Sequence, residues 1–173
     1  MTFEEIIVQL ENNVPVIRSL TENMTQAQAS WKADPERWSV LEIINHINDI
    51  EVEDFRHCLD LVLFHPDTEW PSFDETAWIT ERSYNGRNFQ DSIHEFVHER
   101  AITLRWLAEL ESPDMNATHS GTGFSGDPMR AGDLMLAWAV HDLFHIQQLA
   151  LLKRDILSEW GKPFSPAYSG FSV

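Results

Sequence analysis

Apolar residues recur every three or four positions along four long stretches of the chain, with polar residues between them. This spacing is typical of an amphipathic helix with one buried face. The stretches extend over about residues 3–17, 39–64, 88–111 and 127–160. We find no stretch that alternates convincingly as a strand does, no internal repeat and no linker. The pattern predicts an all-α protein, a four-helix bundle in a single domain over residues 1–173.

The second stretch has a well-marked beginning. Ser39 and Glu42 form a capping box, in which each side chain bonds the other residue's backbone N–H. Trp38, just before the box, is placed to pack against Ile43 and to fix the direction in which the chain enters the helix. The apolar positions continue to an X-Pro pair that disfavours helical backbone. We expect one helix over residues 39–64.

The first stretch contains a proline. Pro15 has no backbone N–H, and its ring clashes with the preceding turn, so this helix should be kinked near Glu11 or split there. The connector that follows, residues 21–37, contains one short turn, for which Thr25 is the candidate N-cap.

Two other helix starts are indicated by capping residues. In the long crossover between the second and third helices, Ser72 and Glu75 form a second capping box, which predicts a short helix through Arg82. Asp127 is the expected N-cap of the last helix, with Pro128 in the favoured first position. The segment before it, up to residue 126, reads as a polar loop with several glycines.

The last helix has histidines on its apolar face. The residues of that face are Leu134, Trp138, His141, His145, Gln148, Leu149 and Leu152. His141 and His145 are one turn apart, so two ring nitrogens can point at a single metal ion. His46 lies one turn from Ile43 and Ile50, on the inward face of another helix. Since ligands converge between facing helices of a bundle, we expect a divalent metal site at His46, His141 and His145.

The alternative is three core histidines that each satisfy their hydrogen bonds separately. Two histidines on one helix face and a third on another helix favour metal over this alternative. Three imidazoles also leave a coordination position open, as in catalytic sites. A zincin reading of His141-Asp142-Leu143-Phe144-His145 is disfavoured, because aspartate replaces the glutamate that would act as general base.

The remaining histidines are expected to be solvated. His94 and His98 also form an i, i+4 pair, but acidic residues surround them, which indicates an exposed face. The others, on an outer face or in loops, are His57, His65 and His119.

Charge and cysteine content exclude several classes of function. The net charge is -16, with no visible basic cluster, which argues against binding to nucleic acid or to an anionic membrane. Cys58 is the only cysteine, so neither an intrachain disulfide nor a cysteine-rich zinc site can form. The acidic N-terminus is unlike a signal peptide, and no apolar run is long enough to span a bilayer. We expect a cytoplasmic protein.

The motif residues resemble those of a known family. The stretch from Trp38 to His46, followed much later by His141-x-x-x-His145-x-x-Gln148, is similar to the DinB-like (YfiT-like) superfamily of metalloenzymes. The resemblance implies a four-helix bundle with a long crossover between helices 2 and 3. It also implies a divalent metal, zinc or nickel, at residues matching the three histidines.

The resemblance further implies a reaction. Relatives include S-transferases that use a low-molecular-weight thiol, so our leading hypothesis is a thiol-dependent S-transferase acting on small electrophiles. The alternatives are a metal-dependent hydrolase and a metal-binding protein without catalysis. Gln148 is a candidate either to orient a bound ligand or to satisfy a polar neighbour. Glu42, Asp49 and Glu51 are candidate acceptors for an imidazole N–H. Relatives also form homodimers, for which we consider Trp70 and Trp78 as candidate contacts.

Overall fold

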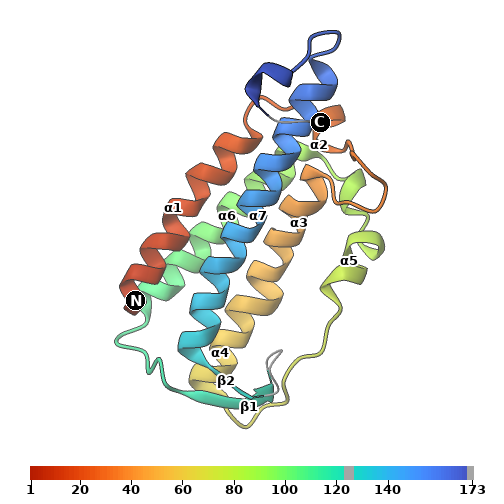
Figure 1. Cartoon of the computed structure of the whole chain (residues 1–173). Coiled ribbons are helices and arrows are strands. Elements are labelled where there is room, and N and C mark those ends of the chain that lie inside the picture. Colours follow the sequence, from red (N-terminus) through yellow and green to blue (C-terminus); the bar gives the residue numbers. More distant parts are fainter. Residues whose placement is uncertain (123–126, 171–173) are drawn as a thin grey trace.

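The computed structural model describes residues 1–122 and 127–170, which form a bundle of long helices (Figure 1). The long helical elements are α1 (Phe3–Thr21), α3 (Val40–Ile50), the π-helical η1 (Glu51–Arg56), α4 (His57–Phe64), α6 (Phe89–Glu109) and α7 (Ala131–Trp160). The shorter elements are α2 (Gln26–Ala29), α5 (Glu75–Glu81), the 3₁₀ turns η2 (Tyr84–Gly86) and η3 (Ala167–Ser169), and the strands β1 (Thr118–Thr122) and β2 (Pro128–Arg130).

The bundle consists of four helical columns that lie side by side. They are α1, the contiguous helix formed by α3, η1 and α4, then α6, and α7. α1 packs against α7 and α6, and α3 packs against α6 and α7 (Figure 1). After α4, the chain crosses the length of the bundle through α5 before α6 begins at the opposite end. The predicted four-helix bundle with a long crossover between its second and third helices is therefore confirmed.

Local capping decides where the second column begins. The Ser39 hydroxyl accepts a hydrogen bond from the backbone N–H of Glu42 at 3.1 Å, and the Glu42 carboxylate accepts one from the N–H of Ser39 at 2.7 Å. Thr25 caps α2 by the same reciprocal pattern. Both predicted starts are confirmed. They could be predicted from the sequence because these contacts involve only residues within one turn.

The second column differs from the prediction in its middle. It is helical from Val40 to Phe64, but η1 has π-helical hydrogen bonding. Glu51 and Phe55 of this segment are buried. Short π-helical segments within α-helices are frequent at functional sites, and both buried side chains lie next to the candidate site described below.

The expected split of the first helix at Pro15 is wrong. α1 continues through Pro15 to Thr21. The carbonyl of Glu11, which loses its partner at Pro15, belongs to an exposed residue. Water can hydrogen-bond to it there, so the helix survives the missing bond.

The expected cap of the crossover helix is also wrong. α5 begins after Asp74, whose Oδ1 accepts hydrogen bonds from the backbone N–H groups of Thr76 and Ala77 at 3.1 and 2.9 Å. Ser72 is not the cap. An aspartate just before the helix supplies the same acceptor from a better position.

The last helix starts later than expected, because strands precede it. β2 pairs antiparallel with β1, and α7 then begins at Ala131, so Asp127 is not its cap. These strands of three and five residues are too short for their alternation to stand out in the sequence. Residues 123–126 of the predicted loop lie outside the described part of the chain.

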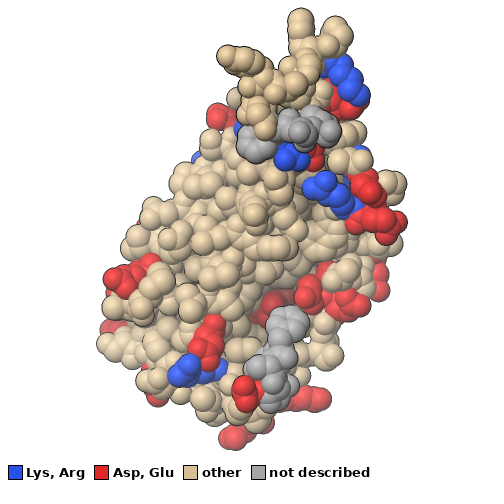
Figure 2. All heavy atoms as spheres, viewed as in Figure 1, with Lys and Arg blue, Asp and Glu red and all other residues tan. Residues whose placement is uncertain are grey.

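An uncharged face extends over the middle of the bundle. Figure 2 shows few charged side chains there, in the region where Figure 1 places α1 and α7. Large exposed apolar side chains of α7 include Leu136, Val140, Leu143, Phe144 and Leu151. The tryptophans considered for self-association belong to the crossover and are largely covered: Trp78 is 8% exposed and Trp70 is half-buried. Among the described helices, we find none with both the length and the apolarity needed to cross a membrane.

Candidate metal centre

Three histidines converge between α3 and α7. His46 comes from α3, and His141 and His145 lie one turn apart on α7. One ring nitrogen of each lies within 4.8 Å of those of the other two. The structure thus brings together the three residues that the sequence singled out.

The spacing of the two α7 histidines fits a shared metal ion. Their Nε2 atoms are 3.2 Å apart. At a zinc–nitrogen distance of about 2.0–2.1 Å, two ligand nitrogens of a tetrahedral site are separated by about 3.3 Å. His46 brings a ring nitrogen within 4.8 Å of both, so the three residues present suit a divalent ion.

Burial keeps these imidazoles neutral. His46 and His145 are 3% and 1% exposed, whereas His141 is half-buried. Desolvation, followed by the neighbouring His145 and His141, lowers the pKa of His46 to about 3. Desolvation and His141 lower the pKa of His145 to about 4, and desolvation also lowers the pKa of His141. Neutral rings have the free lone pair that a metal ligand requires.

Gln148 orients one of the rings. Nδ1 of His145 donates a hydrogen bond to the Gln148 side-chain oxygen at 2.8 Å. A proton on Nδ1 leaves the lone pair on Nε2, the atom that faces His141. Among the described residues, Nδ1 of His46 and Nδ1 of His141 have no hydrogen-bond partner. Gln148 thus satisfies a polar neighbour, which is one of the two roles considered for it.

Aromatic rings surround the cluster. Trp38 packs against His46 with ring centroids 4.8 Å apart and stacks on His145 at 6.1 Å. Phe55 lies 5.5 Å from His141, and Phe144 lies 5.1 Å from His145. The sequence predicted only the packing role of Trp38 at the helix start, and it gave no signal for Phe55 or Phe144.

A buried ionic network lies beside the cluster. The Arg100 guanidinium donates to both carboxylate oxygens of Glu51 at 2.8 and 2.9 Å, and to both of Asp142 at 2.7 and 2.9 Å. Asn13 also donates to Asp142, at 3.0 Å. Arg100, Glu51 and Asp142 are each at most 1% exposed. Asp142 is therefore committed to structural hydrogen bonds, which agrees with the rejection of a zincin mechanism.

The candidate acceptors for an imidazole N–H are engaged elsewhere. Glu42 accepts from the backbone at the start of α3. Asp49 accepts from Arg82 at 2.6 Å, and Glu51 accepts from Arg100. In the described structure none of the three bonds a histidine, so this expectation is wrong, and Gln148 fills the role for His145.

The histidines outside the cluster mostly lie on the surface, as expected. The exposed ones are His57, His65, His94 and His98. His119 is the exception, because it is 1% exposed on β1 and its ring lies 5.1 Å from that of Trp70. The sequence could not indicate this burial, since it depends on the unpredicted hairpin packing against the crossover.

Comparison with known proteins supports the fold and the family. The sequence profile of the DinB superfamily matches residues 9–149. The structure is similar to that of YfiT from Bacillus subtilis, with a TM-score of 0.76 and 16% sequence identity over 89% of this chain and 87% of that chain. YfiT is described as a probable metal-dependent hydrolase with an unusual four-helix bundle topology. No curated protein matches the chain.

Proposed function

Because the chain belongs to the DinB superfamily, we propose that it is a metal-dependent enzyme in which His46, His141 and His145 hold one divalent ion. The observation that carries the proposal is the convergence of three neutral imidazoles at one point between α3 and α7. Three protein ligands would leave one coordination position of such an ion open, next to which a small-molecule substrate could bind.

A divalent ion bound there lowers the pKa of a water molecule or thiol that shares it, so that a nucleophile exists at neutral pH. The chain's own residues prepare the position. Gln148 holds the His145 ring with its Nε2 lone pair directed toward His141. Trp38 and Phe144 cover His145 and limit the access of bulk water to it.

We propose hydrolysis as the reaction. The support is the likeness to YfiT, which is described as a probable metal-dependent hydrolase. The aromatic rings around the histidines give an ester or amide substrate an apolar surface to lie on, next to the activated nucleophile.

Thiol transfer is the second candidate, and a specific observation favours it. In the described structure, the carboxylates near the histidines are held by other partners, as Asp142 is by Arg100, and none is free to act as general base. Water bound to a zinc ion would have a pKa of about 7 and be only partly ionised, whereas a coordinating thiol would be deprotonated outright, so thiol transfer depends less on a base. The chain has no reactive thiol of its own, because burial, together with Asp54, raises the pKa of Cys58 far above its ordinary value.

One experiment separates these functions. The zinc-loaded and nickel-loaded proteins would be assayed with an activated aryl ester, and separately with an activated aryl halide plus a low-molecular-weight thiol. Ester turnover that is lost in His141→Ala supports hydrolysis, and thiol-dependent halide turnover lost in that variant supports transfer. If neither turnover rate of the wild type exceeds that of His141→Ala, the enzyme proposal is wrong. The non-catalytic alternative predicts instead that removing the metal with a chelator lowers the melting temperature.

A further inference from the structure

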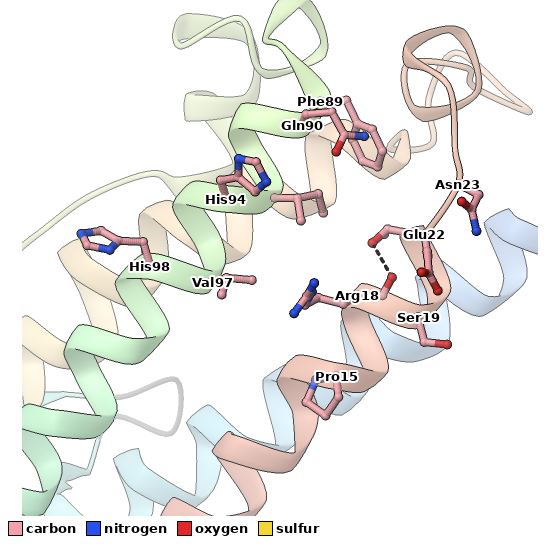
Figure 3. A pocket seen from close by; sticks show the side chains of 12 residues that line it. Pro15, Arg18, Ser19, Glu22, Asn23, Phe89, Gln90, His94, Val97 and His98 are labelled. Carbon is pink, nitrogen blue, oxygen red and sulfur yellow. Dashed lines mark hydrogen bonds between the residues drawn. The ribbon is translucent and has the colours of Figure 1, made fainter.

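A second cavity lies away from the histidine cluster. A groove of about 660 Å³ opens between residues 15–23, at the end of α1, and residues 89–98, in the first half of α6 (Figure 3). None of the three candidate metal ligands lines it. Its volume falls in the range of small-molecule sites.

One wall of the groove carries a cation without an acidic partner. Arg18 is exposed, and in the described structure its guanidinium forms no ion pair, whereas Lys32, Arg82 and Arg100 each bond a carboxylate. Figure 3 shows the Arg18 side chain reaching from α1 toward Val97 of α6. Glu22 also lines the groove, but its carboxylate does not pair with Arg18 in the described structure.

Most cations of the described structure are paired, and Arg18 is one of the few that are not, with Arg105 and Lys153. Acidic residues outnumber lysine and arginine by 28 to 12. A guanidinium has five N–H donors arranged to match the two oxygens of a carboxylate. At Arg18 these donors remain available to a ligand that enters the groove.

The opposite wall is apolar at its base and polar at its edge. Ile93 and Val97 of α6 line this wall, and Pro15 adds an apolar side chain from the α1 wall. His94 and His98, one turn apart, lie along the α6 edge, where an imidazole N–H can donate a hydrogen bond (Figure 3). A ligand that satisfies both walls has an anionic end and an apolar body.

We propose that this groove binds a small organic carboxylate. The carboxylate pairs with Arg18, and the apolar body lies on Ile93, Val97 and Pro15. The inference is independent of the proposed metal chemistry, since no residue is shared between the two sites. The apolar wall distinguishes this ligand from a bare inorganic anion.

The test is a residue-resolved NMR titration of the full chain with benzoate. The expected result is saturable shifts of backbone amides in residues 15–23 and 89–98. Arg18→Gln should weaken benzoate binding by at least about tenfold, through loss of a charge-assisted, bidentate contact. The matched control is Arg105→Gln. Like Arg18, Arg105 is exposed and forms no ion pair among the described residues, but it lies on α6 outside the groove.

Two further ligands and one further variant complete the test. Benzamide lacks the charge and inorganic phosphate lacks the apolar body, so both should bind more weakly than benzoate. Val97→Asp, which adds a carboxylate to the apolar wall, should abolish binding while leaving the amides of the rest of the chain in place. Equal binding of benzoate and benzamide, unchanged affinity in Arg18→Gln, or shifts confined to the surroundings of His141 would each overturn the proposal.

Discussion

Gln148 accepts a hydrogen bond from Nδ1 of His145 at 2.8 Å, one turn further along the same helix. The contact determines which nitrogen of His145 keeps its lone pair, because a protonated Nδ1 leaves Nε2 free. Gln148, which would not contact the ion itself, therefore determines which nitrogen of His145 is available as a metal ligand.

Gln148→Leu should lower zinc affinity by about 10–100-fold, because the His145 ring loses the acceptor that fixes its tautomer and orientation. Competition with a chromogenic chelator measures the affinity. Gln148→Glu keeps an acceptor and should bind zinc at least as tightly as wild type. Gln147→Leu, at an exposed neighbouring position, is the matched control and should have no effect. Equal affinities in all four proteins would show that this hydrogen bond does not matter for the site.

The histidine cluster itself predicts metal content. His141→Ala or His46→Ala should lose stoichiometric divalent metal, because each removes one of three ligands. His94→Ala should retain it, since His94 lies on an exposed face of α6. Elemental analysis of protein purified without an affinity tag measures the content. Equal metal in all three variants would mean that the metal is bound elsewhere.

The ionic network predicts a large effect on stability. Arg100→Met leaves the buried carboxylates of Glu51 and Asp142 without their cation, which should lower the free energy of unfolding by roughly 3–5 kcal/mol. Arg105→Met changes an exposed arginine on the same helix and should stay within about 0.5 kcal/mol of wild type. Denaturant unfolding followed by circular dichroism measures both. A small effect of Arg100→Met would mean that the carboxylates find other partners or protonate.

Acid should destabilise the metal-free protein through its buried histidines. The pKa of His46 is lowered to about 3 and that of His145 to about 4, against about 6.5 in an unfolded chain. As pH falls through 6.5, the unfolded chain gains protons that the folded protein does not bind until pH 4 to 3. Stability should therefore decrease over this window, by up to about 1.4 kcal/mol per pH unit for each histidine.

The comparison that isolates this effect is wild type against His46→Asn. Burial raises the pKa of Asp54 to about 6, so this carboxyl acts in the opposite direction and stabilises the folded state as pH falls. Its contribution is common to both proteins and cancels in the difference. Denaturant titrations at pH 7, 6 and 5 should give a shallower pH dependence for the variant, and parallel curves would contradict the assignment.

The uncharged face predicts self-association. Exposed Leu136, Val140 and Leu143 lie on α7 within a region with few charges (Figure 2). Two copies that each carry a net charge of -16 repel one another elsewhere, so a homodimer should use this face. Sedimentation should show a dimer that Leu136→Glu converts to monomer, whereas the charge-matched control Ala101→Glu, at an exposed position of α6, should leave the dimer intact. A monomeric wild type, or a dimer that Leu136→Glu leaves intact, would exclude this interface.

Residue order alone was enough to predict the features that depend on neighbours within one turn. The capping box of Ser39 and Glu42 sets the start of α3, and the i, i+4 spacing of His141 and His145 sets their common face. His46 could be added because the apolar stripe of its helix shows which side is buried. These features rest on contacts between residues at most four positions apart, or on periodicity along one helix.

The partners of the buried polar groups could not be predicted, because they depend on how the helices pack. Arg100 lies 49 positions from Glu51 and 42 from Asp142, and no local pattern indicates that the three meet in the core. The burial of His119 likewise depends on a hairpin whose strands are too short to show a pattern of their own. Local hydrogen bonding and periodicity are fixed by residue order, whereas the partner of a buried charge is fixed by which helices pack together, and that is a property of the whole chain.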